Sequence, residues 1–138
     1  MNIEYPKSTI SAAAFIKRNW SGCKGWSRDR FLAWLQWHID NCRFVSVREG
    51  GRVKAVILFR FVDSEIDARQ SEYADTNGHL CYVTLCVSES KRFIRAIFGV
   101  WWDAGLRNKN EVCWARDKYN LRETRTSVEQ LGRRLGYG

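Results

Sequence analysis

Five residues at the end of a predicted strand carry the groups best suited to hold an anion. They are Val87, Ser88, Ser90, Lys91 and Arg92. A helix is predicted directly after them, so its free N-terminal N–H groups would lie beside two cations. One interpretation is therefore a phosphate-binding corner. The other is ordinary helix capping by Ser88, with the basic side chains in solvent.

The cysteines and histidines favour packing over metal binding. Five Cys, an odd number without a Cys-x-x-Cys pair, argue against a disulfide scaffold or a zinc finger. Cys81 and Cys86 are five positions apart on one predicted strand, which would point them to opposite faces. His38 and Cys42 have helical i, i+4 spacing, but two ligands do not make a metal site. We expect reduced, packed thiols and no metal centre.

Basic side chains are concentrated towards the C-terminus. The 138-residue chain has a net charge of +8, and residues 91–138 hold 11 basic and 5 acidic side chains. This excess favours an anionic partner, such as nucleic acid or an acidic protein surface, although solvated basic faces are the alternative. Candidate phosphate contacts, which no recognised nucleic-acid motif accompanies, are Arg116, Lys118, Arg122, Arg125, Arg133 and Arg134.

Tryptophan offers a second candidate contact surface. Seven Trp is a high number for this length. Trp101 and Trp102 fall at the end of one predicted helix, so at most one of them can point fully inward. One interpretation is a core Trp beside a partly covered neighbour. The other is an interface anchor, because exposed Trp is enriched at binding hot spots.

The composition is that of a folded domain. Hydrophobic residues make up 45% and aromatic residues 14%, which excludes a disordered chain. A mean hydropathy of −0.43 and the absence of any long apolar run exclude a helical membrane span. The N-terminus lacks a basic segment followed by an apolar run, so no secretory signal is predicted. We expect one domain over residues 1–138, in the cytoplasm or packaged in a virion.

The N-terminal half predicts two helices and a hairpin. Ser11 and Ser27 are predicted to cap helices over residues 12–19 and 28–42. Two β-rich runs then meet at Gly50-Gly51, a dipeptide that supplies the positive φ of a tight turn. Residues 63–79 are acidic and polar, and we expect them to form a long loop.

The C-terminal half predicts alternating strands and helices. Strands over residues 80–87 and 111–116 flank a helix over about 89–104, and Thr124 or Thr126 opens a last helix. The order of elements indicates a mixed α/β domain.

That order, with several local phrases, resembles the GCN5-related N-acetyltransferase (GNAT) superfamily. "FVSVREGGRVKAVILFRFVD" looks like the second and third strands of the family, "LCYVTLCV" like the fourth, and "EVCWAR" like the fifth. "KRFIRAIFGVWWDAG" resembles the helix behind the cofactor, and "SVEQLGRRLGY" the closing phrase. The resemblance covers residues 27–137. It implies a single-domain GNAT-like fold with a mostly antiparallel sheet flanked by helices, and acetyl-CoA as the cofactor if the protein is active.

The sequence departs from the family pattern where cofactor binding and catalysis would be built. Active members carry an Arg/Gln-x-x-Gly-x-Gly/Ala loop whose backbone approaches the pyrophosphate. Arg92 can fill the basic position, but Phe93, Ile94 and Arg95 occupy the glycine region. Gly132 stands where the family often has a Tyr that protonates the leaving thiolate. We expect the C-terminal strand pair to be missing, and the first strand has only "NIEY" available.

If the chain is an enzyme, the resemblance implies an acyl-CoA-dependent N-acyltransferase in which a base deprotonates the acceptor amine. Glu72, Asp75 and His79, ahead of the fourth strand, are the candidate bases. Tyr119 and Tyr137 are the candidate substitutes for the missing acid.

We expect instead a GNAT-like domain without catalysis or a bound cofactor. It would act as a basic structural or binding module, for example in a phage virion or another mobile-element protein. Acetyl transfer from acyl-CoA to an amine, and non-specific nucleic-acid binding, are the alternative hypotheses.

Overall fold

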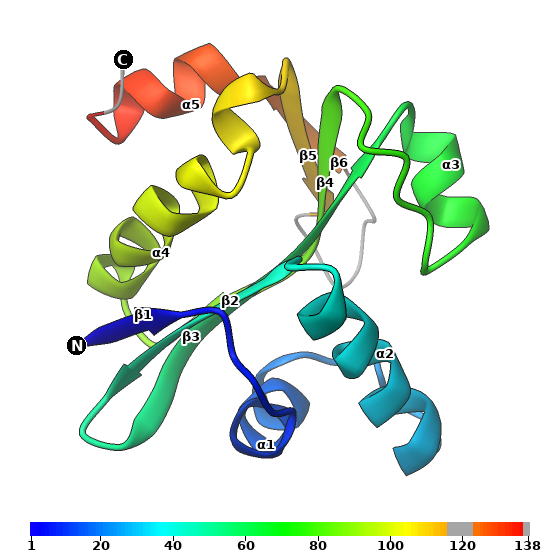
Figure 1. Ribbon diagram of the computed structural model, residues 1–138, viewed down its shortest axis with the longest axis vertical. Helices are drawn as coiled ribbons and strands as arrows, with labels where there is room; N and C mark the ends of the chain where they lie inside the picture. Colours follow the sequence, from blue (N-terminus) through cyan, green and yellow to red (C-terminus); the bar gives the residue numbers. More distant parts are fainter. Residues whose placement is uncertain (116–122, 137–138) are drawn as a thin grey trace.

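The computed structural model describes residues 1–115 and 123–136 as a single sheet with helices on both faces (Figure 1). The elements, in chain order, are β1 (Asn2–Glu4), α1 (Ile10–Asn19), α2 (Arg28–Asp40), β2 (Phe44–Glu49), β3 (Arg52–Val62), α3 (Glu65–Gln70), β4 (Leu80–Ser88), α4 (Lys91–Asp103), the 3-10 turn η1 (Leu106–Asn108), β5 (Glu111–Ala115), β6 (Glu123–Ser127) and α5 (Val128–Arg134).

The strands lie in the order β1-β2-β3-β4-β5-β6. All neighbours are antiparallel except β4 and β5, which run parallel. Helices α4 and α5 cover one face of the sheet, and α1, α2 and α3 lie on the other. This confirms the predicted mixed α/β fold with a mostly antiparallel sheet.

The β2–β3 hairpin follows the sequence prediction, and a first strand that the predicted order of elements did not contain is present. Gly50 and Gly51 have φ values of 61° and 77°, in the left-handed region that a two-residue hairpin turn requires. Strand β1, for which only "NIEY" was available, pairs with β2 from Asn2↔Arg48 to Glu4↔Ser46.

Each face of the sheet has its own apolar core. Alternate side chains of β3 pack into the two cores. This strand is therefore buried on both sides, and its sequence is almost continuously apolar. Phe59 and Phe61 pack with Phe98 and Trp101 of α4 on one face. Leu58 belongs to the other core, which includes Phe15, Phe31, Trp34 and Leu35 of the α1–α2 pair.

The prediction that Thr124 or Thr126 opens a helix is wrong. Both residues lie in β6, which pairs antiparallel with β5, and the β-branched Thr type favours a strand. The helix cap is Ser127, whose Oγ accepts a hydrogen bond from the Gln130 N–H at 3.0 Å. Within the described residues no strand follows α5, in line with the expected loss of the last strand pair.

Two helix starts also differ from the prediction. Helix α1 begins at Ile10, with Thr9 rather than Ser11 at its N-cap position. Helix α4 begins at Lys91, with Ser90 rather than Ser88 at its N-cap position.

The predicted loop over residues 63–79 contains a short helix, α3. Ser64 Oγ accepts from the Asp67 N–H at 3.3 Å and caps it. A six-residue helix leaves no clear apolar period in the sequence, so the pattern gave no signal for it.

Helix α2 begins at the predicted cap but ends earlier than expected. Ser27 Oγ accepts from the Arg30 N–H at 3.1 Å. The helix stops at Asp40, and Cys42 is exposed with a φ of 57°. Cys42 therefore does not pack beside His38 as predicted, because it lies beyond the helix in a left-handed conformation.

A buried polar layer holds the segment after α3 against the sheet. Arg60 of β3 is 3% exposed, and its guanidinium donates to the carbonyl oxygens of Ala68 (3.0 Å) and Ser71 (2.5 Å). Arg43 Nε donates to Asp75 Oδ2 at 2.5 Å. Burial alone would raise the pKa of Asp75, but the hydrogen bonds from Arg43 and from the Asn77 N–H lower it.

His38 makes the stability of the fold depend on pH. Burial in α2 lowers the pKa of His38 to about 4; the carbonyl of Trp34 and the Asp75 carboxylate raise it, and Arg60 and Arg43 lower it further. An unfolded His titrates near 6.5, so between these values the unfolded state binds more protons and stability falls as pH falls. We expect the free energy of unfolding to drop by about 2–3 kcal/mol between pH 7 and pH 4.5.

Urea denaturation at several pH values measures this dependence. His38→Leu should remove most of the slope over that range. An unchanged slope in the variant would assign the acid loss of stability to other groups.

Candidate ligand-binding site

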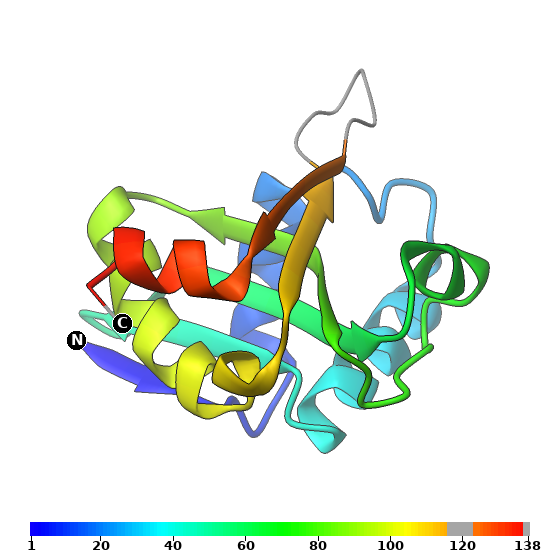
Figure 2. The same ribbon diagram turned by 90° about the horizontal axis from the view of Figure 1, so that it is seen from above.

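Strands β4 and β5 part halfway along β4. They pair only from Leu80↔Glu111 to Val83↔Trp114, although β4 continues to Ser88 and stays paired with β3. Figure 2 shows the two strands diverging. Beyond Val83, the edge of β4 that faces β5 has no partner strand among the described residues, so a ligand can approach this backbone.

A β-bulge marks the point where the strands part. Leu85 pairs with Leu58 and Val83 pairs with Phe59, which leaves Thr84 as an extra residue in β4. Bulges bend a strand and increase its twist, and this one directs the second half of β4 away from β5.

The bulge corrects the prediction for Cys81 and Cys86. Cys81 pairs with Phe61 and Cys86 pairs with Ile57, and both partners belong to the core beneath α4. The two thiols therefore lie on the same face of the sheet, not on opposite faces. The extra Thr84 shifts the two-residue repeat of the strand by one position.

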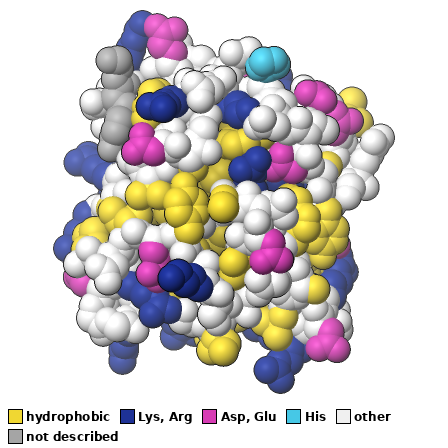
Figure 3. Space-filling view, in the orientation of Figure 1, with side chains coloured by type: hydrophobic (Ala, Val, Ile, Leu, Met, Phe, Trp, Pro, Cys, Tyr) yellow, Lys and Arg dark blue, Asp and Glu magenta, His cyan; other side chains and the backbone are white. Residues whose placement is uncertain are grey.

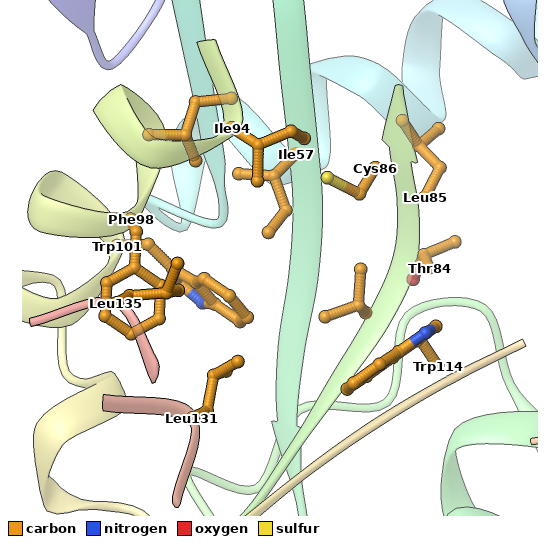
Figure 4. Close-up of a pocket in the computed structure, with 12 residues that line it drawn as sticks. Ile57, Thr84, Leu85, Cys86, Ile94, Phe98, Trp101, Trp114, Leu131 and Leu135 are labelled. Carbon is orange, nitrogen blue, oxygen red and sulfur yellow. The ribbon is translucent and has the colours of Figure 1, made fainter. Parts of the chain in front are cut away.

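An apolar groove of about 270 Å³ lies where the strands part. In Figure 4, Ile94, Phe98 and Trp101 of α4 stand on one side, and Thr84, Cys86 and Trp114 lie across from them. Leu131 of α5 and Leu135, the residue that follows this helix, close one flank. Figure 3 shows apolar side chains in a band across the middle of this view, with charged side chains above and below.

Two lining residues, Thr84 and Trp101, have a buried polar atom without a hydrogen-bond partner among the described residues, and the hydroxyl of Thr84 is the one that can also accept a hydrogen bond. Its Oγ1 atom is buried and has no hydrogen-bond partner among the described residues. A hydroxyl both donates and accepts, and burying one without a partner costs stability. Thr84 therefore presents an unused hydrogen-bonding group to a ligand.

The thiol of Cys86 has low nucleophilic reactivity in this position. Water reaches its side chain, but burial among the apolar lining raises the pKa of its thiol to about 11. The thiol is therefore protonated near neutral pH and is not the thiolate that nucleophilic attack needs. No Asp, Glu or His is among the described lining residues, so the groove suits binding of an apolar chain with one polar group.

The predicted anion-binding corner lies beyond the end of the groove, at the start of α4. Ser88 Oγ donates to the Ser90 carbonyl at 2.6 Å and accepts its N–H at 3.3 Å. Arg92 is paired with Glu49 at 2.6 Å, whereas Lys91 is exposed. The structure thus brings Ser88, Ser90, Lys91 and Arg92 together, but the Val87 side chain packs on the opposite face of the sheet.

The predicted catalytic residues do not line the groove. Glu72 pairs with Arg30 of α2 at 3.4 Å, and Asp75 is held by Arg43. His79 precedes β4 and lines a separate hollow with Asp63 and Arg125. Tyr119 and Tyr137 lie outside the described residues.

The predicted partner surface is only partly described, because Arg116, Lys118 and Arg122 lie outside the described residues. Arg125 pairs with Glu65 at 2.5 Å and with Glu111 at 3.0 Å. Arg133 pairs with Glu129, and Arg134 is exposed. Much of the described basic charge in this region is therefore engaged within the molecule.

The two adjacent tryptophans differ in burial. Trp101 is 7% exposed and belongs to the α4 core, while Trp102 is half-buried and packs on Phe98 with ring centroids 5.7 Å apart. This arrangement fits a core Trp with a partly covered neighbour.

Residues 1–115 and 123–136 contain neither a metal site nor a membrane-spanning helix. No group of three or more His, Cys, Asp or Glu side chains there could hold a metal ion. None of the helices in these ranges is long and apolar enough to cross a membrane.

Comparison with solved structures identifies the fold. No family model matches the chain, and no curated protein matches it. A loading GNATL domain of CurA from Lyngbya majuscula superimposes with a TM-score of 0.63 at 9% identity, over 86% of this chain and 66% of that one. The chain has the GNAT fold.

Two other structures agree with the GNAT fold. The GphF GNAT-like decarboxylase, solved with isobutyryl-CoA, gives a TM-score of 0.64 at 11% identity, over 100% of this chain and 73% of that one. An N-acetyltransferase from Staphylococcus aureus Mu50 gives 0.56 at 16% identity, over 86% and 74%. The chain thus spans about two thirds to three quarters of the length of these GNAT-fold proteins.

Thr84→Val tests whether the hydroxyl in the GNAT-fold groove is unpartnered. We expect the free energy of unfolding to stay unchanged or to rise by up to about 1 kcal/mol, because the variant removes a buried group without a partner. Chemical denaturation measures it. Ser27→Ala is the control for a hydroxyl that does accept a hydrogen bond, and it should cost about 1 kcal/mol. A comparable loss in Thr84→Val would show that its hydroxyl is bonded in the folded protein.

Proposed function

We propose that this GNAT-fold domain is a binding module that holds an acyl thioester in the groove between β4 and β5. The observation that carries the proposal is the parting of these strands at the Thr84 bulge, beside an apolar groove. The acyl chain would lie among the apolar side chains of α4 and α5. The Thr84 hydroxyl, unpartnered among the described residues, would bond the thioester carbonyl.

The open edge of β4 supports a thioester carried on an amide-containing arm. Extended chains with amide groups add to a free strand edge through backbone hydrogen bonds. The pantetheine arm of coenzyme A contains two such amides and matches the unpaired edge beyond Val83. The GphF decarboxylase was solved with an acyl-CoA, which is consistent with this class of ligand.

We propose further that the domain binds the acyl thioester without transferring the acyl group to an acceptor. Glu72 and His79 lie away from the groove, and Asp75 is engaged with Arg43. At the corner where the family places its glycine loop, Arg92 is paired with Glu49 and a Ser88–Ser90 turn occupies the backbone. The proposal keeps two predictions made from the sequence. The protein would act in the cytoplasm or in a virion, and a partner would bind its basic C-terminal third.

Calorimetry with acyl-CoA of increasing chain length tests the ligand class. We expect saturable binding that tightens by about a factor of four for each added methylene until the groove is full. Free CoA should bind more weakly than any acyl form. Affinity that is independent of chain length, or no binding at low and moderate salt, would contradict the proposal.

Thr84 variants and a thiol-release assay test the mode of action. Thr84→Val should weaken acyl-CoA binding about 3- to 10-fold, the value of one neutral hydrogen bond, while Thr84→Ser keeps the hydroxyl and most of the affinity. Incubation with acyl-CoA and a panel of amines should release no CoA thiol above the uncatalysed rate. Release of CoA thiol that depends on the protein would contradict the proposal and show that the domain is an acyltransferase.

A further inference from the structure

A second site candidate lies outside the acyl groove, at the turn between α1 and α2. A hollow of about 470 Å³ is formed there within residues 17–26, and we call it the cationic hollow. Its lining includes Lys17, Arg18 and Lys24 together with Trp20 and Trp26. Residues 17–30 contain five basic side chains and a single acidic one.

The cations of this region are not neutralised within the described part of the chain. Lys17, Arg18, Lys24 and Arg28 form no ion pair there. By contrast, several arginines elsewhere have a carboxylate partner, including Arg43, Arg48 and Arg125. The free positive charge at the α1–α2 turn is therefore available to an external anion.

The position of Arg28 works against helix stability. It lies in the first turn of α2, where the helix dipole already places partial positive charge and where acidic side chains such as the adjacent Asp29 are favoured. Arg28 thus adds to this region a cation that has no ion-pair partner among the described residues.

Trp20 and Trp26 line the cationic hollow, and the indole of Trp34 packs against both of them. Trp34 is buried and stacks on Trp20, with centroids 5.4 Å apart and an interplanar angle of 8°. Trp26 is in T-shaped contact with both rings, at 6.3 and 5.3 Å, and the Arg30 guanidinium lies over the Trp26 ring at 3.9 Å. A side chain at Gly22 would place its Cβ 2.2 Å from Trp20, so the loop lies directly against this cluster. The half-buried Trp20 and Trp26 thus hold fixed positions beside the cations.

We propose that the cationic hollow binds a single-stranded nucleic acid. Lys17, Arg18, Lys24 and Arg28 would contact successive phosphates, and a base would contact the part of the half-exposed Trp26 that the Arg30 guanidinium does not cover. Cations along a groove combined with fixed aromatic rings are the features that bind single strands without reading sequence. A duplex hides its base faces and offers less to the indole. The α1–α2 turn lies across the sheet from α4 and α5, so this site is separate from the acyl groove (Figure 1).

Salt dependence of binding to a labelled 20-mer of thymidine tests the phosphate contacts. With the full chain, fluorescence anisotropy at 50–200 mM salt should give a log–log slope of about −2.8 for four contacts on a single strand. Lys24→Gln/Arg28→Gln should weaken binding and reduce the slope by about 1.4. The matched control, Arg95→Gln/Arg107→Gln, removes two exposed charges from α4 and η1 and should leave the slope unchanged. Equal effects of both pairs would overturn a localised site.

The melting temperature separates a binding role of Arg28 from a structural one. Arg28→Gln should leave the melting temperature unchanged or raise it, because it removes a cation from a helix N-terminus. A lower melting temperature would make Arg28 a structural residue and overturn its binding role.

Competition with other polyanions tests the choice of ligand. A 20-base-pair duplex and inorganic polyphosphate should compete more weakly than unlabelled thymidine 20-mer at equal charge. Trp26→Leu should remove this preference while keeping the salt slope. Equal competition by all three polyanions would overturn the assignment to single strands.

Discussion

The architecture depends on a conflict between the two neighbours of β4. Strand β3 pairs with it along its whole length, whereas β5 pairs with only its first four residues. One extra residue, Thr84, resolves the conflict by bending the strand where the second partner leaves. The groove, the unpaired strand edge and the buried hydroxyl all arise at this point. Apolar side chains of α4 and α5 then supply walls of the groove.

The two faces of the sheet have different physical characters. The α4–α5 face combines an apolar core with an apolar groove. The α1–α2 face instead buries His38 and Arg60 beneath aromatic rings and backbone carbonyls. The cationic hollow lies at the margin of this face. Because the sheet lies between them, a ligand on one face need not disturb the packing of the other. The same small domain can therefore offer an apolar site and an electrostatic site at once.

Local signals in the sequence predicted much of the fold. The Gly50-Gly51 turn, the Ser27 cap and the apolar runs of β3 and β4 indicated elements correctly because each depends on neighbouring residues. The bulge was invisible, since an apolar run alternating around Thr84 is equally compatible with a regular strand. The pairing of Arg92 with Glu49 joins positions far apart in the chain, so an apparently free cation could not be recognised as engaged. The cationic hollow was not predicted because acidic residues elsewhere in the N-terminal half offset its basic side chains, so the net charge of that half is small.

The bulge also shows what the extra residue contributes to the strand. On either side of Thr84 the strand repeats every two residues, but the two halves are out of phase by one position. Deleting Thr84 would bring the halves into phase and make Phe59↔Val83 and Leu58↔Leu85 successive pairs of a regular ladder. Leu85 to Ser88 would keep the faces that they already occupy, and the bend would be lost. The packing of β4 on its two cores therefore does not need this residue, whereas the groove does.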